Sequence, residues 1–144
     1  GRRAVKVLLD TCTLAELRSP EGNPSVKSAV AEIPDADLYL SVITVGEIAK
    51  GIALLSAGKK KRNLGAWLAA LATQFEGRIL GVDVEIARIW GELTARAQKT
   101  GVVIPGLDGL LAATALRHGL HVMTRNTRHF EASGVLLIDP WQGV

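Results

Sequence analysis

Short apolar segments recur along the chain, and each is typical of a buried strand. They are rich in Val, Leu and Ile, and they lack the strict polar alternation of a strand with one face in water. The predicted strands are residues 5–9, 38–43, 78–82, 120–124 and 135–138.

Between these strands, apolar residues return at spacings of three and four, which predicts amphipathic helices. The predicted helices are residues 44–57, 63–75, 83–99 and 108–118. The last is apolar on most sides and ends at Gly119, so we expect a central, buried helix. Strands that alternate with helices predict an α/β fold, with a mostly parallel central sheet flanked by helices in one domain over residues 1–144.

The composition fits this interpretation and excludes several other classes. A chain of 144 residues with 48% hydrophobic and 22% charged residues is typical of a globular domain with its own core. No apolar run approaches the ~20 residues of a membrane span. The single Cys12 and the absence of a signal-peptide pattern predict a cytoplasmic protein. A net charge of +3 permits an anionic partner without requiring one.

Candidate chemistry lies where the predicted strands end. Asp10 follows the first strand, Glu47 lies one turn into the helix after the second, and Asp108 opens the apolar helix. Asn126 follows the fourth strand. Because sites in parallel sheets form at the carboxyl ends of strands, we expect these four side chains to gather at one edge.

Each residue also has a structural interpretation. Asp10 and Asp108 are typical helix N-caps, and Thr44 with Glu47 matches a capping box. Asn126 is a common turn residue. Three carboxylates at one edge would nevertheless repel one another unless a cation lay between them. Mg²⁺ held by carboxylates serves phosphodiester hydrolysis, which favours a metal-dependent nuclease.

The same segments resemble the PIN-domain ribonuclease toxins of the VapC type, most of all their FitB-like branch. The segments are LLDT at 8–11, SVITVGEI at 41–48, DGLLAATA at 108–115, TRNTR at 124–128 and IDPW at 138–141. The resemblance implies an RNA endonuclease that uses Mg²⁺ or Mn²⁺, a small antitoxin that occupies the active site, and a homodimer. It places Asp10, Glu47 and Asp108 as the first three metal-binding acids, and Asn126 at the fourth position.

Two residues depart from the family pattern. Cys12 stands where these toxins usually carry Asn, and it cannot reproduce the hydrogen bonds of an amide. His129 stands where Asp is usual, which removes a negative charge or adds a donor for phosphate. Both departures keep an alternative open: a PIN-fold protein that holds RNA or an antitoxin without efficient cleavage. His129 also favours Mn²⁺, which accepts nitrogen ligands.

Several neighbouring residues are candidates for supporting roles. Arg125 and Arg128 flank Asn126 and match the geometry of an RNA phosphate, although both also fit ordinary surface arginines. Thr11 and Thr44 would support a carboxylate or a water, or cap a helix. The run 59–62 predicts either a solvated helix start or an extended RNA surface. The tryptophans, Trp141 among them, are more typical of core or interface residues than of base-stacking platforms.

Overall fold

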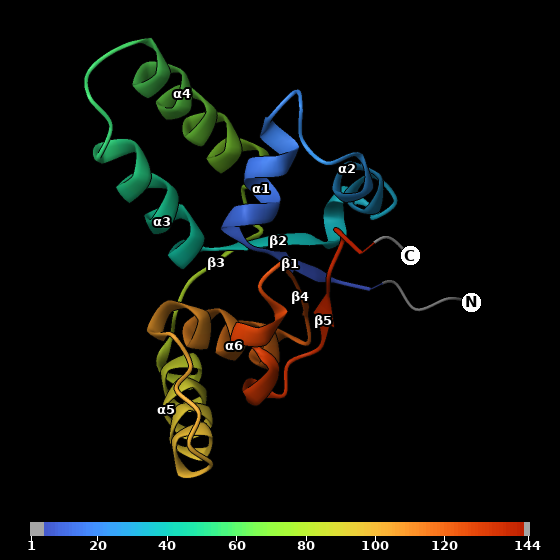
Figure 1. The fold of residues 1–144 in the computed structure, drawn as a ribbon, viewed down its shortest axis with the longest axis vertical. Coiled ribbons are helices and arrows are strands. Elements are labelled where there is room, and N and C mark those ends of the chain that lie inside the picture. The colour runs from blue at the N-terminus through green and yellow to red at the C-terminus, as the bar shows by residue number, and fades with distance from the viewer. Residues whose placement is uncertain (1–4, 143–144) are drawn as a thin grey trace.

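A parallel sheet forms the centre of the computed structural model, which describes residues 5–142 (Figure 1). The strands are β1 (Val7–Leu9), β2 (Leu38–Ser41), β3 (Ile79–Leu80), β4 (His121–Met123) and β5 (Leu137–Ile138). They lie in the order β3-β2-β1-β4-β5, and every pairing is parallel. The α/β class and the parallel sheet predicted from the sequence are confirmed.

The strand order reverses between β1 and β4. From β1 the chain builds outward through β2 to β3, whereas β4 and β5 fill the other side. In open parallel sheets the crevice at such a reversal, outside the carboxyl ends of the strands, is where ligands bind. Asp10 follows β1 directly and Asn126 lies three residues beyond β4, so both flank this point.

Helices cover both faces of the sheet. Their bounds are α1 (Thr11–Arg18), α2 (Pro24–Ala31), α3 (Val42–Ala53), α4 (Lys59–Gln74), α5 (Val84–Lys99) and α6 (Gly106–His118), with 3-10 turns η1 (Asp35–Asp37), η2 (Thr127–His129) and η3 (Glu131–Ser133). Figure 1 shows α5 and α6 on one side of the sheet and α1 to α4 on the other. No helix within residues 5–142 is long and apolar enough to cross a membrane.

Strand β1 divides the core because consecutive side chains point to opposite faces. Leu8 packs in the cluster formed with α5 and α6, whereas Val7 and Leu9 pack with α1 to α4. All three are at most 1% exposed. A strand buried on both faces explains why β1 reads as a continuous apolar run.

Two helices, α1 and α2, are absent from the sequence prediction. Asn23 caps α2 by accepting from the Ser25 and Val26 amides, and Pro24 occupies its first turn. Asn followed by Pro is a typical helix start, so the signal for α2 was present. The start of α1 contains Thr11 and Thr13, whose β-branched side chains favour helices weakly, and the apolar residues there show no clear helical periodicity.

Other boundaries shift by a few residues. Ser41 ends β2 and caps α3 through the Ile43 amide, so α3 begins two residues earlier than predicted. Helix α4 also starts earlier, at Lys59, and its first turn carries the basic run 59–62. Three of these four basic residues are exposed, which fits the solvated helix start.

Candidate active site

Asp10 lies at the centre of the sheet edge and is almost fully buried, at 7% exposure. It caps α1, because its Oδ1 accepts from the Thr13 amide at 2.9 Å. The Cys12 thiol lies 3.1 and 3.0 Å from the two carboxylate oxygens. Burial, and then the charge of Asp10, raise the pKa of the Cys12 thiol to about 11, so the S–H proton stays in place at neutral pH and is donated to Asp10.

Glu47 projects from the second turn of α3, and it does not belong to a capping box. Ser41 is the N-cap of this helix, so Thr44 lies inside it and the capping-box interpretation is wrong. Glu47 instead receives a hydrogen bond from Thr11 Oγ1 to its Oε1 at 3.0 Å. Thr11 therefore supports a carboxylate, one of the two roles expected from the sequence.

Asp108 lies in the first turn of α6 but does not cap it. Pro105 is the N-cap, and no side chain satisfies the helix amides there, so the capping interpretation is also wrong for Asp108. Its Oδ2 lies 3.0 Å from Nδ1 of His129. The Asp108 side chain is 22% exposed and that of His129 is 50% exposed, so this contact lies at the surface of the crevice.

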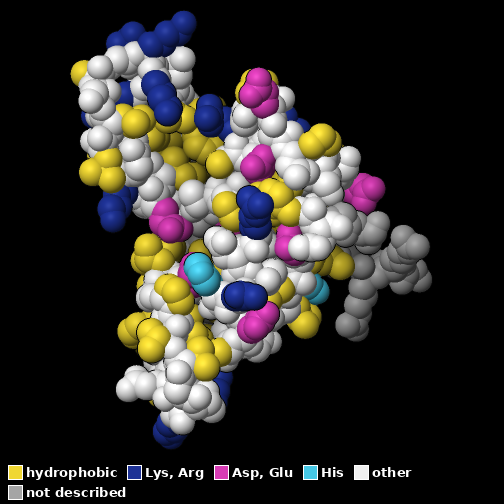
Figure 2. Space-filling model, viewed as in Figure 1, with side chains coloured by type: hydrophobic (Ala, Val, Ile, Leu, Met, Phe, Trp, Pro, Cys, Tyr) yellow, Lys and Arg dark blue, Asp and Glu magenta, His cyan; other side chains and the backbone are white. Residues whose placement is uncertain are grey.

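The three carboxylates are close enough to influence one another's charge. Burial is the largest cause that raises the pKa of Glu47, and the charges of Asp108 and Asp10 raise it further against the Thr11 hydrogen bond. Burial also raises the pKa of Asp108, His129 lowers it, and Asp10 raises it. Figure 2 shows acidic and basic side chains together on the middle of this face, with a histidine against an acidic side chain. The three acids therefore lie within electrostatic reach of one another at this edge.

The segment after β4 brings further candidate residues to the same edge. Asn126, Arg125 and Arg128 are all exposed there. The Asn126 amide nitrogen of the backbone donates to Thr124 Oγ1 at 3.0 Å, and its side chain makes no hydrogen bond with the three acids among the described residues. The Arg125 guanidinium carbon lies 5.7 Å from the centre of the Trp141 ring. Sequence reasoning did not place Trp141 at the site.

Thr44 occupies a different environment from Thr11. It is fully buried, and within residues 5–142 its hydroxyl has no hydrogen-bond partner. A buried hydroxyl without a partner costs free energy, so its position on the Glu47 helix is unexplained by packing alone. In contrast to the Thr44 hydroxyl, the side chains of Cys12 and His129 have hydrogen-bond partners. Cys12 contacts Asp10 and His129 contacts Asp108, so both departures from the family pattern lie directly against the candidate acids.

The described side chains at this edge are not arranged as a preformed metal site. No three His, Cys, Asp or Glu side chains within residues 5–142 converge at metal-binding distance. Each acid is instead turned toward a donor: Asp10 toward Cys12, Glu47 toward Thr11 and Asp108 toward His129. Oxygen ligands and unfavourable burial of like charges nevertheless suit a hard divalent cation. The three acids fit such an ion once these hydrogen bonds are exchanged.

The Thr11 contact gives a direct test of this electrostatic arrangement. Thr11→Val is expected to raise the pKa of Glu47 further, because the hydrogen bond that lowers it is lost. The folded pKa then lies further above the unfolded one, so stability should fall at neutral pH and recover as the pH drops through the folded pKa. Carboxyl NMR titration measures the shift. Thr94→Val is the matched control, since the Thr94 hydroxyl has no partner among the described residues, and an equal Glu47 shift there would contradict the account.

Comparison with known proteins agrees with the fold and with the order of the motifs. Residues 7–135 match the family model described as PIN domain. The chain is 40% identical to a VapC ribonuclease of Sinorhizobium fredii over 141 residues, which is 94% of this chain and 98% of the relative. It is also 40% identical to Toxin FitB of Neisseria gonorrhoeae over 136 residues, with the same coverage.

A solved structure gives the same result in three dimensions. The crystal structure of FitAcB from Neisseria gonorrhoeae superposes with a TM-score of 0.89 at 40% identity, covering 94% of this chain and 98% of that one. The superposition therefore covers nearly all of this chain, including its five-stranded parallel sheet. The chain belongs to the PIN domain family, and its resemblance to the VapC-type toxins, including FitB, is confirmed.

Proposed function

We propose that this protein is a divalent-metal-dependent endoribonuclease, the toxin of a toxin–antitoxin pair, acting in the cytoplasm. The observation that carries the proposal is the set of Asp10, Glu47 and Asp108 at the reversal of strand order, where burial and mutual charge raise the pKa of Glu47 and Asp108. Names of relatives at 40% identity, a ribonuclease and a toxin, support the same activity.

In this mechanism the three acids would hold the cation, and the surrounding residues would orient the acids. Mg²⁺ or Mn²⁺ supplies Lewis-acid chemistry to the scissile phosphodiester when it is bound. Thr11 orients Glu47 through its 3.0 Å hydrogen bond, and Cys12 does the same for Asp10. His129, 3.0 Å from Asp108 Oδ2, would keep that carboxylate oriented toward the other two acids.

The segment that follows β4 supplies the RNA contacts. We assign Asn126 as the fourth member of the catalytic set, because it follows β4 at the sheet edge that carries Asp10 and its side chain makes no capping hydrogen bond to η2. Arg125 and Arg128 are exposed on either side of it. Their guanidinium groups pair with RNA phosphates and offset the repulsion between RNA and the three acids.

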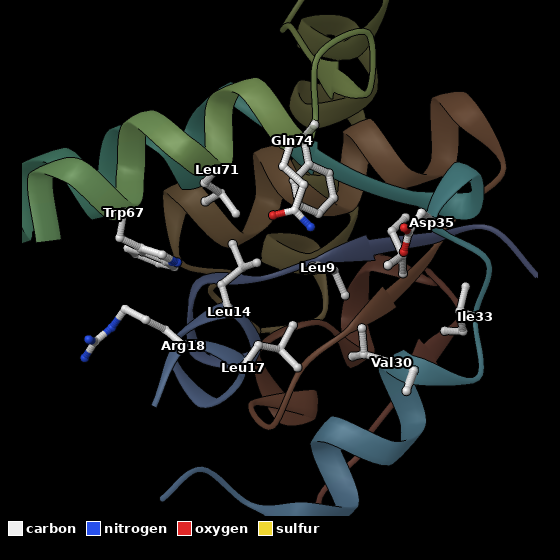
Figure 3. A pocket seen from close by; sticks show the side chains of 13 residues that line it. Leu9, Leu14, Leu17, Arg18, Val30, Ile33, Asp35, Trp67, Leu71 and Gln74 are labelled. Atoms are coloured by element: carbon white, nitrogen blue, oxygen red, sulfur yellow. The ribbon is translucent and has the colours of Figure 1, made fainter. Parts of the chain in front are cut away.

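An antitoxin partner has a groove available that leads to these acids. Figure 3 shows a cavity between α1, α2 and α4, with Leu14, Trp67 and Leu71 among its apolar lining residues. A second cavity shares Arg18 and Trp67 with the first and continues between α1, α3 and α4 to Thr11 and Glu47. An apolar antitoxin segment in this groove would end at the candidate active site and block it.

A homodimer is the remaining part of the proposal. Several apolar side chains of α5, α6 and the segment between them, on the side of the sheet opposite α1 to α4, are exposed. They include Val84 at 77%, Val103 at 87% and Leu107 at 47%. Exposed apolar residues in one region are typical of a protein interface, and a second copy of the chain is the occupant that the family resemblance supports.

The experiment is incubation of the purified protein with single-stranded RNA in Mg²⁺, Mn²⁺ or chelator, with DNA of the same sequence as a control. Cutting of RNA that requires a metal, and that chelator abolishes, is the expected result. A folded protein that binds RNA but cuts it with neither metal would favour the binding protein. That alternative draws its support from Cys12 in place of Asn and from the His129 contact with Asp108.

A further inference from the structure

Arg125 and Trp141 meet at the sheet edge that carries the acids. Arg125 is the second residue after β4, and Trp141 is the third residue after β5. These two strands are parallel neighbours, so their carboxyl ends open on the same edge as the end of β1. We call this pair the Arg125–Trp141 stack, because the guanidinium carbon lies 5.7 Å from the ring centre.

The backbone of Arg125 lies close to Cys12, the neighbour of Asp10 in the candidate active site. The backbone amide of Arg125 and the Thr124 hydroxyl both interact with the Cys12 thiol and lower its pKa, against the larger effects of burial and Asp10. Cys12 in turn contacts both oxygens of Asp10, at 3.1 and 3.0 Å. Cys12 therefore links the backbone that carries Arg125 to the most buried acid of the candidate active site.

The turn that carries Trp141 is fixed in place. The Trp141 backbone amide donates to Asp139 Oδ1 at 2.9 Å, and the Ser25 hydroxyl donates to the Pro140 carbonyl at 2.8 Å. Figure 1 shows this last segment turning back beside α2. A platform held in advance loses little freedom when a ligand binds to it.

The Arg125 guanidinium is free to bind a ligand, unlike that of a similar pair elsewhere. Arg78 also lies over an aromatic ring, that of Phe75, at 4.7 Å. Arg78, however, donates to the carbonyls of Asp35, Leu38 and Gln74 at 2.6, 2.6 and 2.8 Å, which assigns it a structural role. Within residues 5–142 the guanidinium of Arg125 has neither a carbonyl nor a carboxylate partner, and the residue is exposed.

We propose that the Arg125–Trp141 stack is a nucleotide-binding subsite of the RNA site, next to the bond that is cut. The base of an unpaired nucleotide stacks on the layer formed by the guanidinium and the indole, and the N–H edges of Arg125 bind the adjoining phosphate. The inference rests on the proposed ribonuclease function and adds a preference for unpaired, strongly stacking bases.

The test measures RNA binding by the full chain in chelator, which suppresses cleavage, with single-stranded poly(A) and poly(U) oligonucleotides as probes. Trp141→Leu should weaken poly(A) binding about tenfold and poly(U) binding less, because stacking is lost. Trp141→Phe should restore most of the affinity. Arg125→Gln should reduce the slope of log affinity against log salt by about 0.7, the value for one phosphate of a single strand.

Controls separate this subsite from a structural role. Arg117→Gln removes the same charge from an exposed residue at the end of α6, and it should leave the RNA affinity nearly unchanged. An abasic nucleotide placed at successive positions of the probe should, at one position, lower the RNA affinity of the wild type by as much as Trp141→Leu does. At that position the abasic nucleotide should not lower the RNA affinity of Trp141→Leu any further.

The outcomes distinguish this inference from the proposed function. RNA that is bound and cut equally well by wild type, Trp141→Leu and Arg125→Gln would overturn the subsite and leave the ribonuclease standing. A wild type that neither binds nor cuts RNA would overturn both. If Trp141→Leu lost the same RNA affinity on abasic and intact RNA and also had a lower Tm, Trp141 would have a structural role and the subsite would be overturned.

Discussion

Asp108→Asn is expected to lower the rate of RNA cleavage by at least about a hundredfold. Loss of a residue that only supports a metal ligand costs about 10–100-fold, and loss of a ligand itself should cost no less. Initial rates on single-stranded RNA in Mn²⁺ measure the effect. Stability at neutral pH should be unchanged or higher, because burial raises the pKa of Asp108 and so penalises its ionised form.

Asp83→Asn is the matched control for this change. Asp83 caps α5 by accepting from the Ile86 amide at 2.9 Å, and it does not contact the three acids. It should alter stability by no more than about 1 kcal/mol, since Asn is also a good cap, and leave the cleavage rate intact. A loss of folding in Asp108→Asn that accounts for its loss of activity would contradict the assignment.

Phe130→Ala is expected to lower the free energy of unfolding by about 3–5 kcal/mol, with Tm lower by on the order of 10 °C. Phe130 is 1% exposed and packs in the core formed with α5 and α6. It directly follows His129, so it also fastens the segment with Asn126 and Arg125 to that core. Thermal unfolding followed by circular dichroism measures the change.

Phe75→Ala tests whether this anchor matters for the site. Phe75 is 3% exposed in the core on the opposite face of the sheet, so its removal should cost a similar amount of stability. At a temperature where both variants are folded, Phe130→Ala should cleave RNA more slowly than Phe75→Ala. Equal rates would show that the segment after β4 is held by other contacts.

The layout of this fold is readable from the sequence because its central strand, β1, is buried on both faces. Short apolar runs such as 5–9 and 120–124 are typical of buried strands in an α/β chain. The carboxyl ends of parallel strands lie at the same edge of the sheet. This rule brought Asp10, Glu47 and Asp108 together before any coordinates were known. Helix α1 was not predicted from the sequence, because it is only 8 residues long and its first turn is rich in threonine.

The finer structure of the site depends on contacts between distant segments. Thr11 and Glu47 are 36 residues apart, and Asp108 and His129 are 21 apart. No local pattern indicates that such pairs meet. The capping box at Thr44 shows the opposite problem, because a local motif fitted well but Ser41 had already capped the helix. Trp141 was likewise predicted to be a core or interface residue, and no local pattern indicated that it lies against Arg125.

The most direct test of the central claim is calorimetric binding of Mn²⁺ to the wild type and to Asp10→Asn, Glu47→Gln, Asp108→Asn and the control Asp83→Asn. A single shared site predicts that each of the first three variants weakens Mn²⁺ binding by roughly tenfold or more, while the control binds as the wild type does. Mn²⁺ affinity that none of the three substitutions changes would contradict the account, because the acids would then not hold the metal together.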